Sequence, residues 1–230
     1  MIYLIGGTKG GIGKSTVACN FAAALAHLGR DVCLVDMDFQ GHSTSWVQTR
    51  REAVEQARKL GVLLPSIHCA QAISDPKQPN RSVTPLLQSY AERYGDLVLD
   101  AGGRNSPELR SALRMCNVVM MPFLASAFDL WTAEDMAELI GVAREYNPRL
   151  DAMCFVNRAS NNWTSQKAGK AREFLGRFSS YYRCAETLVH ERDAFSSTIS
   201  DGIAVMEYGA RGNKAADELY ALISEVGVAA

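Results

Sequence analysis

The sequence predicts an α/β fold: a doubly wound, mostly parallel sheet with helices on both faces. Short apolar runs recur along the 230 residues, at positions 2–5, 32–35, 97–99, 118–121 and 153–156. None of them alternates apolar with polar residues, which is typical of strands covered on both sides. A turn and a helical pattern follow each run, as expected of βα units. We therefore expect one domain, residues 1–230, whose ligands bind at the carboxyl ends of the strands.

The expected helices carry apolar residues at helical spacing. The first, at 17–28, is rich in alanine and follows a glycine-rich turn. The others are expected at 45–60, 83–94, 107–116, 130–146, 165–178 and 214–226. This alternation of strands and helices suits a single α/β domain of this length.

The turn between the first strand and the first helix has the composition of a phosphate-binding loop. It reads Lys9-Gly10-Gly11-Ile12-Gly13-Lys14-Ser15-Thr16. Glycines let backbone N–H groups curl around an anion, and the helix that follows points its positive dipole end at the same place. In such a loop Lys14 reaches the β- and γ-phosphates, and the Ser15 hydroxyl is a ligand of Mg²⁺.

Acidic residues stand where two of the expected strands end. The second apolar run leads into Asp36 and Asp38, and the third leads into Asp100. Carboxylates at the ends of parallel strands meet at one edge of the sheet, beside the phosphate loop. We expect Asp38 and Asp100, with Ser15, to hold Mg²⁺ or its water shell.

One position departs from the ordinary phosphate-loop pattern, since Thr8 stands where its first glycine would be. With Lys9, the octapeptide from Thr8 to Ser15 resembles the deviant Walker A box of the ParA/MinD family. The resemblance implies that Lys9 crosses a dimer interface to the nucleotide of the partner subunit. It also implies catalytic roles for Lys9, Lys14 and Asp38, and gives Asp100 the place of the Walker B aspartate.

Later segments are similar to the same family. Residues 119–131 resemble its strand, proline and aspartate loop, and residues 191–219 resemble its closing helices. Phe39 replaces a common proline, and Asp100-Ala101-Gly102-Gly103 replaces Asp-Thr-Pro-Pro; these two glycines are either a γ-phosphate sensor or a plain turn. Asn157 is expected to contact the base, and because residues 155–158 lack the GTPase signature, ATP is preferred over GTP. The expected nucleotide-binding residues are Gly10, Gly11, Ile12, Gly13, Lys14, Ser15, Thr16, Asn157 and Arg158.

The resemblance implies an ATP-dependent homodimer that binds nonspecific DNA and positions a plasmid, a chromosome or another large cargo. Slow basal ATP hydrolysis would be stimulated by a ParB-like or other adaptor protein. The net charge of −1 means that any DNA-binding surface must be local. Seven basic against three acidic residues between positions 158 and 192 mark a candidate stretch, although an ordinary solvated helix face would look the same.

Other features restrict the function. The six cysteines lack C-x-x-C spacing and are expected to be reduced core thiols, so iron–sulfur chemistry is not indicated. We expect no N-terminal helix-turn-helix extension, no membrane anchor in the short acidic C-terminus, and a cytoplasmic, nucleoid-associated protein. Two alternatives stay open: a nucleotide-switch scaffold for a conjugation or secretion apparatus, and a metabolic P-loop ligase.

Overall fold

A parallel sheet of seven strands forms the centre of the domain in a computed structural model, which describes residues 1–74, 82–127, 131–162 and 164–228. The order across the sheet is β3-β2-β4-β1-β5-β6-β7, and each neighbouring pair is parallel. The strands are β1 (Ile2–Ile5), β2 (Val32–Met37), β3 (His68–Gln71), β4 (Asp96–Ala101), β5 (Val118–Phe123), β6 (Asp151–Val156) and β7 (Arg183–Cys184). The doubly wound α/β fold predicted from the sequence is confirmed.

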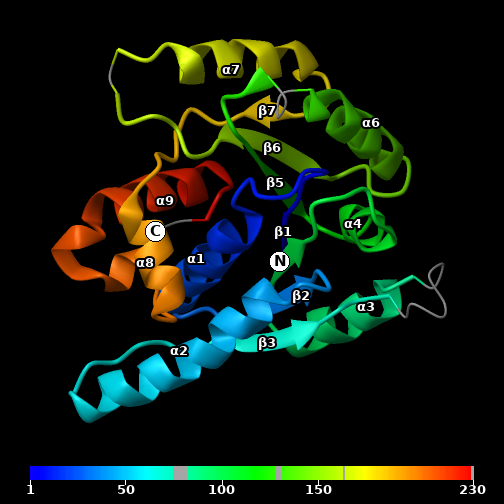
Figure 1. Cartoon of the computed structure of the whole chain (residues 1–230). Coiled ribbons are helices and arrows are strands. Elements are labelled where there is room, and N and C mark those ends of the chain that lie inside the picture. The colour runs from blue at the N-terminus through cyan, green and yellow to red at the C-terminus, as the bar shows by residue number, and fades with distance from the viewer. Residues whose placement is uncertain (75–81, 128–130, 163, 229–230) are drawn as a thin grey trace.

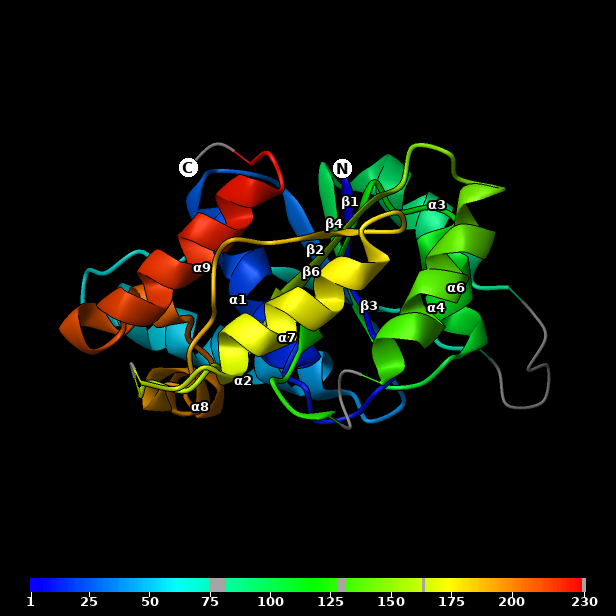
Figure 2. The same cartoon turned by 90° about the horizontal axis from the view of Figure 1, so that it is seen from above.

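The helices lie on the two faces of this sheet (Figures 1 and 2). One face carries α1 (Lys14–His27), α2 (His42–Lys59), α8 (Asp193–Ser200) and α9 (Asn213–Glu225). The other carries α3 (Thr84–Arg93), α4 (Pro107–Leu113), α6 (Thr132–Arg144) and α7 (Lys167–Leu175). Neighbouring residues of a strand serve opposite layers: Tyr3 and Ile5 pack under α1, and Leu4 packs on the other side. This is why the strands read as continuous apolar runs.

Helix α1 is the central element of its layer. Three consecutive alanines, Ala22, Ala23 and Ala24, are fully buried, and such small side chains let α1 lie close to the sheet and to α9. The buried Asn20 donates to the carbonyl of Thr16 and accepts from the backbone N–H of Val205. That bond ties the C-terminal segment to the helix that begins at the phosphate loop.

The sequence misplaced several boundaries and missed two strands. Helix α1 begins at Lys14 and α2 at His42, each three residues before the expected start, whereas α6 and α7 are shorter than expected. Strands β3 and β7 carry no apolar run. Each lies at an edge of the sheet, pairs with one neighbour only and contains no fully buried residue, so it does not need apolar residues at every position. Helix α8 was expected only through the family resemblance. No helix among the described residues is long and apolar enough to cross a membrane.

Candidate functional site

The phosphate loop joins β1 to α1 at the carboxyl edge of the sheet. Gly13, with φ +90°, adopts the left-handed conformation that turns the chain into α1. Lys14 is the first residue of that helix and is 7% exposed, and its Nζ donates to the carbonyl of Lys9 at 2.6 Å. Burial lowers the pKa of Lys14, while Asp100 and Asp38 oppose that shift. The lysine is therefore held inside the loop, close to both carboxylates.

Asp100 is a buried carboxylate at the end of β4, in register with Ile5 of β1 and Asp36 of β2. The Ser43 hydroxyl donates to its Oδ2, whereas its Oδ1 has no hydrogen-bond partner among the described residues. Burial raises the pKa of Asp100 to about 6, although hydrogen bonding from Ser43 opposes the shift. A buried acceptor without a partner is costly, and a hydrated cation would satisfy it.

The two aspartates after β2 have different surroundings. Asp36 is buried and accepts from the backbone N–H and the hydroxyl of Thr44, at 2.8 and 2.9 Å, and from the backbone N–H of Asp38. It fixes the turn that leads into α2. Asp38 is only partly buried and accepts from the backbone N–H of Gln40. Asp36 thus holds the turn, and Asp38 is left facing the cavity.

The glycine pair after Asp100 packs directly on the phosphate loop. A Cβ at Gly103 would lie 2.5 Å from the backbone nitrogen of Gly10, and a Cβ at Gly102 would lie 3.1 Å from Oδ2 of Asp38. A proline at position 103, as in the Asp-Thr-Pro-Pro text, would also carry a Cβ into this space. The close approach explains why this chain has glycine there.

Asn157 and Arg158 follow β6 at the same edge. The Asn157 side chain is buried and donates to the carbonyl of Ile12 at 2.8 Å, and a Cβ at Gly13 would come within 2.5 Å of its Nδ2. The Asn157 side chain therefore holds the phosphate loop through the carbonyl of Ile12. Arg158, with φ +48°, adopts a left-handed conformation that is uncommon for a residue with a side chain, and it is exposed.

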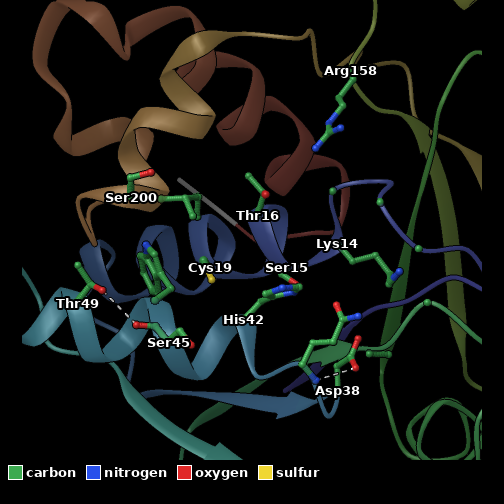
Figure 3. Close-up of a pocket in the computed structure, with 18 residues that line it drawn as sticks. Lys14, Ser15, Thr16, Cys19, Asp38, His42, Ser45, Thr49, Arg158 and Ser200 are labelled. Atoms are coloured by element: carbon green, nitrogen blue, oxygen red, sulfur yellow. Dashed lines mark hydrogen bonds between the residues drawn. The ribbon is translucent and has the colours of Figure 1, made fainter.

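Two cavities meet over the N-terminus of α1. The first, of about 450 Å³, is lined by most of the phosphate loop, by Asp38 and by residues of α2 and α8, among them His42, Thr49 and Ser200 (Figure 3). The second, of about 420 Å³, is lined by Asn157, Arg158 and the segment at the start of α8. Gly13, Thr16, Arg158 and Ile199 line both. A nucleotide spanning them would place its phosphates in the loop and its nucleoside beside Asn157 and Arg158.

The structure brings most of the predicted site residues together. Lys14, Ser15, Thr16 and Asp38 line the first cavity, and Asp100 lies beneath it, bonded to Ser43 at the start of α2. Lys9 is partly buried and is not among the residues that line either cavity. Phe128, Asp129 and Leu130, of the segment similar to the family's proline and aspartate loop, lie outside the described residues.

Sequence reasoning missed Ser43 and His42. Neither stands in a recognisable motif, and only the folding of α2 toward β4 brings Ser43 to Asp100. Among the described residues, no group of three or more His, Cys, Asp or Glu side chains could form a metal cage. The Ser15 hydroxyl and the carboxylates of Asp38 and Asp100 are oxygen donors of the kind that Mg²⁺ prefers.

Comparison with known proteins identifies the family. The model of the CobQ/CobB/MinD/ParA nucleotide-binding domain matches residues 3–212. The chain belongs to this ParA/MinD family. It is 31% identical over 221 residues to the maintenance of carboxysome distribution protein A of Halothiobacillus neapolitanus, covering 95% of this chain and 92% of that protein. It is 35% identical over 158 residues to the chromosome-partitioning ATPase Soj of Thermus thermophilus, covering 62% of each.

Solved structures of ParA/MinD proteins share the fold. An ATP complex of an aspartate-to-alanine variant of Cyanothece McdA has a TM-score of 0.73 at 14% identity, covering 100% of this chain and 97% of that one. MinD of Aquifex aeolicus has a TM-score of 0.64 at 18% identity, covering 100% and 98%. The chain is thus a nucleotide-binding ATPase domain of the ParA/MinD family, with relatives that position or partition cargo.

Proposed function

We propose that this ParA/MinD domain binds ATP and Mg²⁺, forms a homodimer on ATP binding, and positions a large cargo on nonspecific DNA. The observation that carries the proposal is the loop itself. Lys14 lies inside the cavity with Asp38, whereas Lys9, five residues earlier, lines neither cavity of its own subunit. A second lysine in the same loop, outside the cavities of its own subunit, suits contact with the nucleotide of a second copy.

The phosphate-loop side chains would divide the work of hydrolysis. Mg²⁺ would be held by the Ser15 hydroxyl and, through water, by Asp38 and the unpartnered oxygen of Asp100; it would neutralise phosphate charge. Lys14 would bind the β- and γ-phosphates, and Asp38 would orient the attacking water. Phosphoryl transfer leaves the protein mostly positioning and charge neutralisation, so slow basal turnover is expected. A partner protein that completes this geometry would raise the rate.

The DNA-binding surface that we propose is narrower than the basic stretch in the sequence. Three of its seven basic residues are engaged in ion pairs: Arg172 with Glu186, Arg183 with Asp151, and Arg192 with Glu218. Lys167 and Lys170 are exposed, one turn apart on α7, and no ion pair within the described residues engages either. Arg177, stacked on Phe174, follows them. We assign phosphate contacts to these three residues.

The test is cosedimentation of the protein with nonspecific DNA, with and without ATP and Mg²⁺. The wild-type protein should sediment with the DNA only when ATP is present. Lys167→Ala with Lys170→Ala should weaken binding uniformly across sequences and reduce the salt dependence by about one counterion for each lysine in contact. Lys59→Ala with Lys214→Ala, both exposed residues on other helices, is the charge-matched control. ATP-dependent dimerisation of the wild-type protein without DNA binding would instead favour a scaffold that recruits proteins.

A further inference from the structure

Two cysteines face each other where β6 meets the edge strand β7. Cys154 and Cys184 are register partners in this parallel pair. Both side chains pack on the face of the sheet that α7 covers, with Cys154 fully buried and Cys184 partly buried. Because the two residues are separated in the sequence, no sequence motif predicts that they pair.

The backbone geometry suits a disulfide bond. Neighbouring strands of a sheet lie about 4.8 Å apart, and disulfides join residues whose Cα atoms are about 4.4–6.8 Å apart. Register partners in a parallel pair also direct their side chains to the same face, which is what both cysteines do here. Since β7 has only two residues and one neighbour, a small movement of this strand can bring the two sulfurs together.

A cation beside the pair favours an ionised sulfur. Arg172 of α7 forms an ion pair with Glu186 at 2.6 Å, while its Nε is buried and has no hydrogen-bond partner among the described residues. The neighbouring Cys154 thiol and the Arg172 guanidinium hold the pKa of Cys184 below its usual range, although burial and Glu186 oppose this shift. The neighbouring Cys184 and burial raise the pKa of the Cys154 thiol.

We propose that Cys184 and Cys154 form a peroxide-reactive dithiol site, in which Cys184 attacks the oxidant and Cys154 resolves the product. In the first step the Cys184 sulfur attacks a hydroperoxide, R–O–O–H. The O–O bond breaks, an S–O bond forms, and the leaving oxygen departs as the alcohol, or as water when the oxidant is hydrogen peroxide. In the second step the Cys154 thiol attacks the sulfenic acid of Cys184. An S–S bond forms, and the hydroxyl leaves as water with the Cys154 proton.

The structure gives each sulfur its role. Cys184 is the accessible sulfur of the two and lies beside the cation, which are the two properties of a reactive thiol. The unpartnered Nε–H of Arg172 is a donor for the oxygen of the sulfenic acid. Cys154 is fully buried, so it is shielded from the oxidant, and it is the register partner of Cys184. In a reducing compartment, thioredoxin-type reductants would reduce this disulfide back to two thiols.

Another cysteine of this chain is a matched reference. Cys69 is also partly buried and lies on β3, the edge strand at the opposite side of the sheet. Burial raises the pKa of its thiol, so far less of it is ionised at neutral pH. Cys19, Cys33 and Cys116 are buried, and burial raises the pKa of each.

The experiment treats the full reduced chain with hydrogen peroxide and follows intact mass and peptide maps. We expect loss of two hydrogen atoms and one cross-linked peptide pair that joins the segments containing residues 154 and 184. Iodoacetamide should alkylate Cys184 at least about tenfold faster than Cys69 at pH 7, because reactivity follows the thiolate fraction. In Cys154→Ser, dimedone should trap the sulfenic acid on Cys184. Arg172→Gln should slow alkylation of Cys184 and leave that of Cys69 unchanged.

Three results would overturn the proposal. One is a Cys184 that reacts no faster than Cys69 in the folded chain. Another is a disulfide that joins any pair other than 154 and 184, or that joins two copies of the chain. The third is an unchanged Cys184 rate in Arg172→Gln whose thermal melting and nucleotide binding match the wild type. Cys184→Ser, with the same melting temperature, is the control that must abolish the cross-link.

Discussion

Replacing Gly103 by alanine tests whether the turn after β4 must lie against the phosphate loop. The new Cβ would lie 2.5 Å from the backbone nitrogen of Gly10, 2.6 Å from its Cα and 2.7 Å from the carbonyl carbon of Lys9. All three are backbone atoms, so no side-chain rotation can make room. One of the two loops must move, and overpacking of this kind costs about 1–3 kcal/mol.

That cost should appear in nucleotide binding. If the phosphate loop is the part that moves, ATP affinity should fall by roughly fivefold to 150-fold, because about 1.4 kcal/mol corresponds to a factor of ten. Titration of a fluorescent ATP analogue measures this change in affinity. A thermal melt measures the part of the cost that lowers the stability of the fold. Gly176→Ala is the matched control, since its Cβ would meet nothing and its φ of −60° suits alanine.

A clear result would refute the reasoning. If Gly103→Ala binds the ATP analogue within twofold of the wild type and melts at the same temperature, the close approach of the two loops has no energetic weight. A loss of stability with unchanged affinity would instead place the strain in the turn after β4 rather than in the phosphate loop.

Four further substitutions separate the other steps. Lys14→Ala should remove a charged contact to phosphate worth about 1.5–3 kcal/mol, so isothermal titration should show ATP binding weakened at least tenfold, and normal affinity would contradict the role of Lys14. Lys9→Ala should bind ATP as a monomer yet show no ATP-induced increase in light-scattering mass; an unchanged increase would exclude the cross-subunit contact. Asp38→Ala should bind ATP but release phosphate much more slowly, and full turnover would remove Asp38 from the mechanism. Glu207→Ala should lower the free energy of unfolding by about 3–5 kcal/mol in urea titrations, because it leaves the buried Arg50 without its carboxylate at 2.7 Å. Although burial raises the pKa of Glu207, hydrogen bonds from Arg50 and His27 hold it at about 2, so the wild type should keep this stability above about pH 4.5 and lose it as the pH falls towards 2; a pH-independent difference between the two proteins would count against the pair.

The sequence by itself determined the phosphate loop, the parallel sheet and the acids at its edge. Lys14, Ser15 and Asp38 could be predicted because glycine spacing and strand ends are local properties of the chain. The family resemblance rested on the same local motifs, and comparison with known proteins confirmed the family. The apolar runs were informative because central strands covered on both faces need apolar residues at every position.

Only the tertiary structure decided which residues support that site and which basic residues remain available. Ser43 contacts Asp100 and Asn157 contacts Ile12 across long stretches of sequence, and Arg172 of α7 pairs with Glu186 after β7. The Cys154–Cys184 pair depends on the register of β6 with β7, an edge strand with no apolar run. Such contacts depend on the order of strands and on the packing of helices over them, because these decide which distant residues share a face. The local sequence sets the chemistry that each residue can perform, and the fold decides which other groups that residue contacts.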